Sequence, residues 1–85
     1  MMEKISITYR GPLRDMTGRD GDETNASNIK DVLKFIKSAY GAEAHAAAKK
    51  MLIAVNGKSV LLLDNLSTRL SSGDTVSFLP IAGGG

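Results

Sequence analysis

The C-terminal stretch FLPIAGGG, residues 78–85, ends in three glycines that leave the terminal carboxylate without neighbouring side chains. Such a run costs backbone entropy and contributes no packing, so stability does not explain it. A terminal carboxyl has a pKa of about 3.5 and is ionised at neutral pH. Because a carboxylate is a poor electrophile, it becomes an acyl donor only after conversion to a mixed anhydride. We therefore expect a partner enzyme that encloses Gly85 together with ATP.

The residues before the glycines are suited to presenting that carboxylate. Pro80 stiffens the exit from the preceding apolar segment and prevents further strand pairing. From Pro80 onward, six residues reach at most about 20 Å, which is enough to enter the active site of a neighbouring subunit. A Cβ at Gly84 would collide with the walls of a narrow channel. We therefore divide the chain into a β-rich domain, residues 1–79, and a flexible C-terminal tail, residues 80–85.

The remainder of the chain offers no catalytic machinery of its own. The absence of cysteine excludes a disulfide framework, a thiolate metal site and a cysteine nucleophile. His45 is the only histidine and has no second ligand candidate nearby, so a metal or base role is not expected. No P-loop sequence is present. We expect this chain to bind no cofactor and no metal, with ATP used by the activating partner.

Length and charge narrow the class of protein. At 85 residues the chain forms one domain with a small core, in which a deep enzyme pocket is hard to build. The net charge of +2 is too weak to argue for nucleic acid. Neither a signal peptide nor a long apolar run occurs, so we expect a cytoplasmic protein without membrane contact. Three arginines near the first connection could meet an acidic partner or form a solvated edge: Arg10, Arg14 and Arg19.

Alternating apolar and polar residues predict half-buried strands near both ends of the chain, at 3–10 and 75–79. The segment at 11–22, GPLRDMTGRDGD, is typical of a loop because of its glycines and proline. A weak second strand is expected near 19–24. The alternation in the two terminal strands indicates that each has one face on the core.

The middle of the chain predicts two helices. Asn28 can cap the first of them, and Asp31 stands at the spacing of a capping box. Its apolar residues recur at helical spacing until Gly41, which stops it. The alanine-rich segment 42–50 favours a second, shorter helix.

A hairpin and a long loop are expected before the last strand. The continuous apolar run 51–55, MLIAV, predicts a central strand, and Asn56-Gly57 is a strong hairpin signal. We expect 59–63, SVLLL, to be the partner strand and 64–74 to be a loop with one helical turn.

This order of elements predicts an α+β fold, a mixed sheet with one main helix packed across it. Placing the first and last strands side by side and parallel at the centre, with the helix in the crossover, buries both alternating faces. That is the β-grasp arrangement of ubiquitin-like proteins.

Partner contacts are expected from apolar residues that the core cannot accommodate. The four residues from Val60 to Leu63 cannot all face the helix, and Leu79 should point away from the core side of its strand. We predict that Leu79, with Leu61 or Leu63, forms an exposed patch that binds a partner. Alternatively, the loop at 64–74 covers these leucines.

Four sequence blocks occur in the order seen in one protein family: LRDMTG at 13–18, AVNG at 54–57, GDTVSFLP at 73–80 and the diglycine end. Over nearly its whole length the chain resembles the small subunit of molybdopterin synthase, the MoaD type. That family is similar to the thiamine sulfur carrier, the ThiS type, and to ubiquitin-like modifiers of archaea. The chain departs from the usual pattern in having Ile81 in place of a second proline and an apparent insertion, LSTR, at 66–69.

The resemblance implies a sulfur-carrier role. In that family a ubiquitin-activating-type enzyme adenylates the C-terminal glycine, sulfur replaces AMP to give a thiocarboxylate, and the large synthase subunit transfers the sulfur to a pterin precursor. Gly85 would then carry the sulfur and Gly84 would precede it. This chain would be the non-catalytic subunit of a heterotetramer with the large subunit. The residues expected to contact partners are Leu61, Leu63, Leu79, Pro80, Ile81 and Gly83.

The sequence leaves three other functions open. A protein modifier would join the same carboxylate to lysines of a target. A thiamine-pathway carrier would use the same thiocarboxylate, although the longer chain and the LRDMTG block favour the molybdopterin side. A passive ubiquitin-like interaction module would need no glycine end at all.

Overall fold

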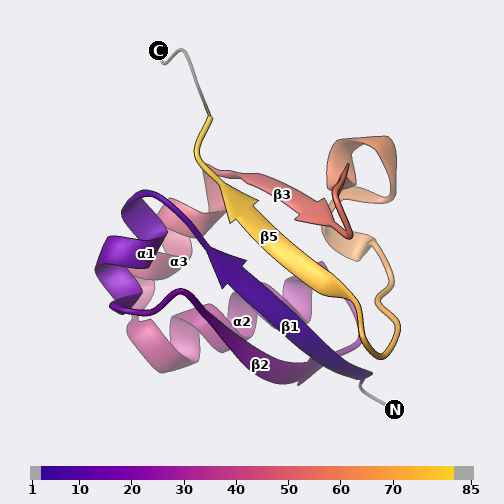
Figure 1. The fold of residues 1–85 in the computed structure, drawn as a ribbon, viewed down its shortest axis with the longest axis horizontal. Coiled ribbons are helices and arrows are strands. Elements are labelled where there is room, and N and C mark those ends of the chain that lie inside the picture. The colour runs from indigo at the N-terminus through magenta and orange to yellow at the C-terminus, as the bar shows by residue number, and fades with distance from the viewer. Residues whose placement is uncertain (1–2, 82–85) are drawn as a thin grey trace.

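Two parallel strands from opposite ends of the chain form the centre of the sheet. In the computed structural model, which describes residues 3–81, β1 (Glu3–Tyr9) pairs in parallel with β5 (Thr75–Leu79). The register places Tyr9 beside Phe78. Both strands therefore end at the same edge of the sheet, as Figure 1 shows. This confirms the predicted pairing of the first and last strands.

The other strands flank this central pair. β2 (Gly21–Ala26) lies antiparallel to β1, β3 (Leu52–Val55) lies antiparallel to β5, and the short β4 (Lys58–Ser59) lies antiparallel to β3. The strand order is β2-β1-β5-β3-β4. Asn56 and Gly57, which join β3 to β4, both have positive φ, as the tight hairpin turn requires. The second strand and the hairpin turn are thus confirmed.

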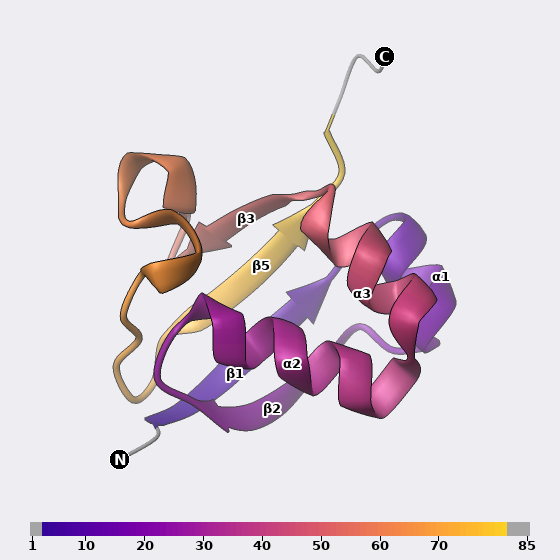
Figure 2. The ribbon, with the colours of Figure 1, turned by 180° about the vertical axis from the view of Figure 1, so that it is seen from behind.

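Two helices cover one face of the sheet. Figure 2 shows α2 (Ile29–Tyr40) crossing in front of the strands and α3 (Ala42–Lys49) following it. The apolar stripe of α2 packs on the inward side chains of the central strands and excludes water from both. This arrangement confirms the α+β, β-grasp fold. The fully or nearly fully buried side chains of this layer are Ile5, Ile7, Ile29, Val32, Leu33, Ile36, Val76 and Phe78.

The start of α2 is held by the expected cap. The Asn28 side chain accepts a hydrogen bond from the Asp31 backbone N–H at 3.0 Å. The Asp31 carboxylate accepts two more, from the Ser27 N–H at 3.0 Å and the Ser27 hydroxyl at 2.7 Å. It therefore reaches one residue further back than a standard capping box does. These bonds, the Ser27 N–H foremost, hold the pKa of Asp31 below its usual value.

The segment predicted as a loop at 11–22 contains a helix, so that prediction is wrong. α1 (Pro12–Thr17) begins at a proline and ends at Gly18 in the left-handed conformation. Proline and glycine usually indicate loops in a sequence, but proline is also favoured at the first helical position and glycine just past the end of a helix. Leu13, which is fully buried, anchors this helix to the core. A helix of one and a half turns leaves too short an apolar pattern to be recognised by periodicity.

The predicted strand at 59–63 is also wrong. β4 ends at Ser59, and a 3₁₀ turn, η1 (Val60–Leu62), follows. The Ser59 hydroxyl accepts a hydrogen bond from the Leu61 N–H at 3.2 Å, which pulls the backbone out of the extended form. A second 3₁₀ turn, η2 (Asn65–Ser67), supplies the helical turn expected in the long loop. β3 is consequently bordered by only two residues of β4, and is less central than its apolar run suggests.

Replacing Asp31 by asparagine should make the free energy of unfolding depend less on pH in the acidic range. The folded-state pKa of Asp31 lies below its ordinary value of 3.8. Its contribution to stability is therefore present above that pH and is lost as pH falls through the folded-state pKa. Asp31→Asn should lower stability at neutral pH by up to about 1 kcal/mol and have little effect near pH 2. Urea unfolding at both pH values measures the difference.

The matched control is Asp64→Asn. Asp64 precedes η2, and its carboxylate makes no capping hydrogen bond there. This variant should leave the pH dependence of the wild type unchanged. If Asp31→Asn shows the same loss at low pH as at neutral pH, the Ser27 contacts do not depend on the ionised carboxylate.

Candidate functional site at the tail exit

β5 leads directly out of the core into a short segment that we call the tail exit, Leu79–Ile81. Phe78, immediately before it, is fully buried. Leu79 is half-buried and pairs with Leu52 of β3, while Pro80 and Ile81 are exposed. The remaining predicted site residues lie outside the residues that the structure describes: Gly83, Gly84 and Gly85. The described part of the chain therefore supplies the base from which the predicted reactive end departs.

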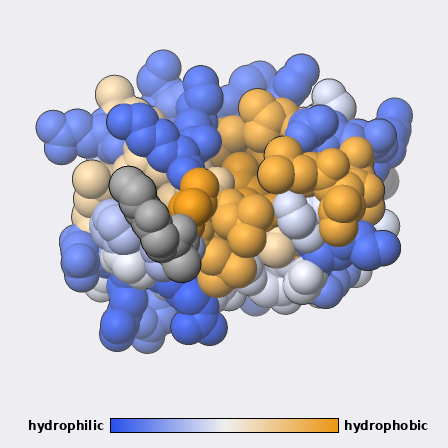
Figure 3. All heavy atoms as spheres, turned by 90° about the horizontal axis from the view of Figure 1, so that it is seen from above, coloured by the Kyte–Doolittle hydropathy of each residue, from blue (hydrophilic) through white to orange (hydrophobic). Residues whose placement is uncertain are grey.

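An apolar groove of about 190 Å³, which we call the tail groove, lies beside the tail exit. Figure 3 shows its apolar surface next to the point at which the chain leaves the domain. The side chains come from the end of α3, from β3 and the residue before it, and from η1, η2 and the tail exit, so elements distant in sequence build one surface. The groove is lined by Lys49, Met51, Leu52, Ile53, Val60, Leu61, Asn65, Leu66 and Ile81.

The surface around the groove exposes large apolar side chains. Leu61 and Leu62 on η1 are 71% and 77% exposed, and Ile81 is 66% exposed. Leu63 is 37% exposed, so the loop at 64–74 leaves it and Leu61 uncovered. An apolar patch of this kind on a small protein is typical of a partner site. The sequence pattern did not single out Leu62, because only the 3₁₀ turn brings three consecutive leucines to the surface.

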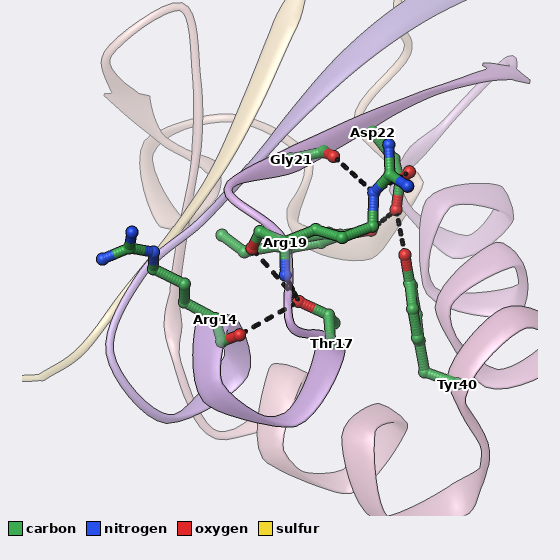
Figure 4. A network of polar contacts seen from close by, with 7 residues as sticks. Arg14, Thr17, Arg19, Gly21, Asp22 and Tyr40 are labelled. Atoms are coloured by element: carbon green, nitrogen blue, oxygen red, sulfur yellow. Dashed lines mark hydrogen bonds and ion pairs between the residues drawn. The ribbon is translucent and has the colours of Figure 1, made fainter.

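A polar cluster fastens α2 to β2 at the sheet edge opposite to β4, on the face that α2 covers. The Asp22 carboxylate accepts hydrogen bonds from the hydroxyls of Tyr9, at 3.0 Å, and Tyr40, and is paired with Arg19 at 3.0 Å (Figure 4). Burial, with the Asp22 carboxylate as a second cause, raises the pKa of Tyr9 well above its ordinary value. Both phenols are therefore neutral donors, and this cluster is structural rather than nucleophilic.

The arginines near the first connection divide into two kinds. Arg14 pairs with Asp20, and Arg19 with Asp22 and the Gly21 carbonyl. Both are thus engaged with their own chain. Arg10 is exposed and, within residues 3–81, forms no ion pair. Of the three, Arg10 is the one whose charge is available to an acidic partner.

The described residues contain no group of side chains suited to a metal ion. Within 3–81, no three metal-binding side chains gather closely enough to hold an ion. His45 is half-buried on α3, where it lines a shallow surface hollow together with Lys49 and Lys50. In the same range, every helix is too short or too polar to cross a bilayer. The tail exit and the tail groove are therefore the features around which a function can be built.

The mixed sheet, the crossing α2 helix and a last strand that runs out into a glycine-ended tail define a ubiquitin-like β-grasp protein. Residues 7–85 match the model of the ThiS family, and the chain belongs to this family. The match reaches the last glycine. It confirms the resemblance drawn from the four sequence blocks.

Solved structures agree with this assignment. The small archaeal modifier protein 1 of Methanosarcina acetivorans is 22% identical with a TM-score of 0.88, covering 100% of this chain and 99% of that one. A chain of the complex of subunits 1 and 2 of the molybdopterin-converting factor from Helicobacter pylori 26695 is 26% identical with a TM-score of 0.69, and the match covers 100% of both chains. A chain of the BexX/CysO complex of Amycolatopsis orientalis is 21% identical with a TM-score of 0.80, covering 95% and 99%. No curated protein sequence matches this chain.

Substitutions in η1 should separate its exposed side chains from its buried one. Leu61→Ser and Leu62→Ser remove apolar surface already in water, so each should change the free energy of unfolding by less than about 0.5 kcal/mol. Val60→Ala removes two methyl groups from a side chain that is only 5% exposed, and should cost about 2 kcal/mol. Urea unfolding followed by circular dichroism provides the comparison. A loss in Leu61→Ser as large as that in Val60→Ala would mean that Leu61 belongs to the core.

Proposed function

We propose that this protein is a sulfur carrier that acts through its own C-terminus, as the small subunit of molybdopterin synthase. The Gly85 carboxylate attacks the α-phosphorus of ATP on a ubiquitin-activating-type enzyme, forming an acyl-adenylate and releasing pyrophosphate. A sulfur nucleophile at the oxidation state of hydrosulfide then attacks the acyl carbon. A C–S bond forms, and AMP leaves. The resulting thiocarboxylate gives its sulfur to a pterin precursor on the large subunit. The chain itself binds no cofactor, is not an enzyme alone, and works in the cytoplasm.

The observation that carries the proposal is the family match through residue 85. It makes the glycine end part of the family pattern rather than an appendage. The fold supports the same reading, because the buried Phe78 anchors the chain immediately before the exposed tail exit. A domain without a catalytic cluster among its described residues is suited to deliver its end to another protein's active site.

The tail groove and the exposed leucines support a protein partner. The apolar surface lies on the same side as the tail exit, so a partner that docks on it also receives the tail. Among the similar structures, one is a complex of the two molybdopterin-converting factor subunits, and another is a complex of BexX with CysO. We assign partner contacts to Leu61, Leu63, Leu79, Pro80, Ile81 and Gly83, to which the exposure of Leu62 adds one further residue.

A protein modifier is the second candidate function. The likeness to the small archaeal modifier protein, with a TM-score of 0.88, favours it, although an identity of 22% speaks for the fold alone. A modifier needs the same activated carboxylate but transfers it to a lysine amine instead of to sulfur. The two functions therefore differ in the nucleophile that attacks the acyl-adenylate. A thiamine-pathway carrier differs only in the acceptor of the sulfur.

Intact mass after activation tests the proposal. Incubation with the activating enzyme, ATP and a sulfur source should add about 16 Da, because one oxygen of the terminal carboxylate is replaced by sulfur. Adding one residue after Gly85, or changing Gly84 to phenylalanine, should abolish this gain while leaving the fold and its thermal unfolding unchanged. Conjugates on target lysines in place of the mass gain would support the modifier. Sulfur transfer that survives deletion of Gly84 and Gly85 would refute both.

Docking can be tested separately from chemistry. Leu61→Ser and Leu62→Ser together should raise the KM for the carrier in adenylation by about tenfold with little change in kcat, because they remove uniform binding energy. Lys30→Ser on the exposed face of α2 is the control and should behave as the wild type. An unchanged KM in the double variant would exclude the patch from the interface with this enzyme.

A further inference from the structure

We propose that Gly11 is a positioning residue for the C-terminal tail: its missing side chain seats the Pro80 ring and sets the direction in which the tail leaves the sheet. This inference rests on the proposed function of the tail. It begins from the parallel register of β1 and β5, in which Tyr9 lies beside Phe78. Two residues further along each strand stand Gly11 and Pro80. The parallel pairing therefore brings Gly11 and Pro80 together just beyond the ends of β1 and β5.

The contact is too close for a Cβ unless Pro80 shifts by a few tenths of an ångström. A Cβ built on Gly11 would lie 3.3 Å from both Cβ and Cγ of Pro80, and 3.7 Å from its Cδ. Carbon atoms in good van der Waals contact are about 3.5–4.0 Å apart, so the added atom would press on the ring. Gly11 also has a φ of +58°, which L side chains rarely adopt. The glycine therefore meets two demands, one from its own backbone and one from the tail exit.

In this contact Gly11 is the more firmly held partner, and Pro80 is the less firmly held one. Leu13, two residues after Gly11, is fully buried, and the Tyr9 N–H donates to the Asp20 carbonyl at 2.8 Å. Pro80 is exposed and, lacking an N–H, cannot donate a ladder hydrogen bond. A side chain at position 11 would therefore displace Pro80 rather than the turn. On its other side the next residue, Ile81, lines the tail groove, so the exit is defined from two directions.

The direction of Pro80 matters for a reaction that occurs at Gly85. A reacting carboxylate must come within about 3–3.5 Å of its target, and a misplacement of about 1 Å can lower a rate about 100-fold. Fixing the first residue of the tail also reduces the conformational freedom that is lost when the partner receives it. Gly11 touches neither ATP nor the carboxylate, and acts only through Pro80.

The test compares Gly11→Ala with Gly18→Ala, using the full chain and its activating enzyme with ATP. Gly18 caps the same helix with a φ of +71°, and a Cβ there meets nothing within 4 Å. Both variants place alanine at a positive φ. Gly18 is in the left-handed helical region, with a ψ of 15°, whereas the ψ of −135° at Gly11 adds strain of its own, so thermal unfolding of both variants is measured alongside. Only the first variant presses on Pro80. Gly11→Ala should lower kcat for adenylation about tenfold with less than about a twofold change in KM, and Gly18→Ala should match the wild type. Equal kcat values for the two variants would overturn the proposal.

A double-variant cycle tests whether the effect passes through Pro80. Pro80→Gly removes the ring, so it should itself lower kcat, and Gly11→Ala added to it should have no further effect. A full additional loss would overturn the proposal. Pro80→Gly also keeps the test valid if Gly11→Ala does not fold, because an unchanged kcat in this variant refutes a role for the contact.

An NMR measurement separates this inference from the proposed function. A proton–proton contact between Gly11 Hα and the Pro80 ring should be seen in the wild type and in Gly18→Ala. Residual dipolar couplings of the Ile81 amide should change in Gly11→Ala alone. If the wild type is never adenylated but these couplings change as expected, the proposed function fails and the positioning contact stands. If adenylation occurs and the couplings do not change, the positioning contact fails.

Discussion

The parallel pairing of β1 with β5 is the interaction on which the rest of the structure depends. Parallel neighbours cannot be joined by a tight turn, so the chain between them must cross the sheet, and α2 does so on the face that needs covering. The same pairing places the alternating apolar residues of both strands under that helix. It also fixes where the chain ends: β5 must stop at the edge where β1 turns into α1. The core and the site are therefore consequences of one register.

At that edge of the sheet, the residues that stabilise the domain are followed directly by those to which we assign the proposed chemistry. Phe78 is buried among the residues that hold the sheet and α2 together, while Pro80, two residues on, is exposed. Among residues 3–81, the core layer between the sheet and α2 includes no residue after Phe78. The end of the chain can consequently be handed to a partner without opening the domain. A small domain with a correspondingly small core has little stability to spare, so this separation is of real use to a carrier.

The fold could be predicted from the sequence because its main elements have strong local signals. Alternation identified the two central strands, the Asn28 cap and a 3.6-residue pattern identified α2, and Asn56-Gly57 identified the hairpin turn. α1 was missed because six residues are too few to show a period, and its proline and glycine are equally common in loops. The run after Ser59 was mistaken for a strand because an apolar run carries no information about backbone shape.

The candidate site was only partly predictable, for the same physical reasons. The glycine end and the leucines Leu61 and Leu63 stood out by residue type alone. Leu62 and the tail groove did not, because they depend on two 3₁₀ turns that a hydroxyl cap and local hydrogen bonds create. The contact between Gly11 and Pro80 could not be predicted without the register of β1 and β5, since nothing in the sequence links position 11 to position 80. Residue type alone predicted the reactive end, whereas the positioning that we propose for it rests on tertiary structure.

Ile81 shows how these parts meet. By resemblance the family has a second proline there, which would continue a stiff, extended exit without any side chain to bury. Isoleucine keeps a backbone N–H and adds an apolar side chain that lines the tail groove with Leu61 and Leu66. A partner that fills the groove therefore contacts the beginning of the tail as it docks. The tail groove and the tail exit form one continuous surface through Ile81, so under the proposed function a partner that binds the groove would also receive the end of the chain.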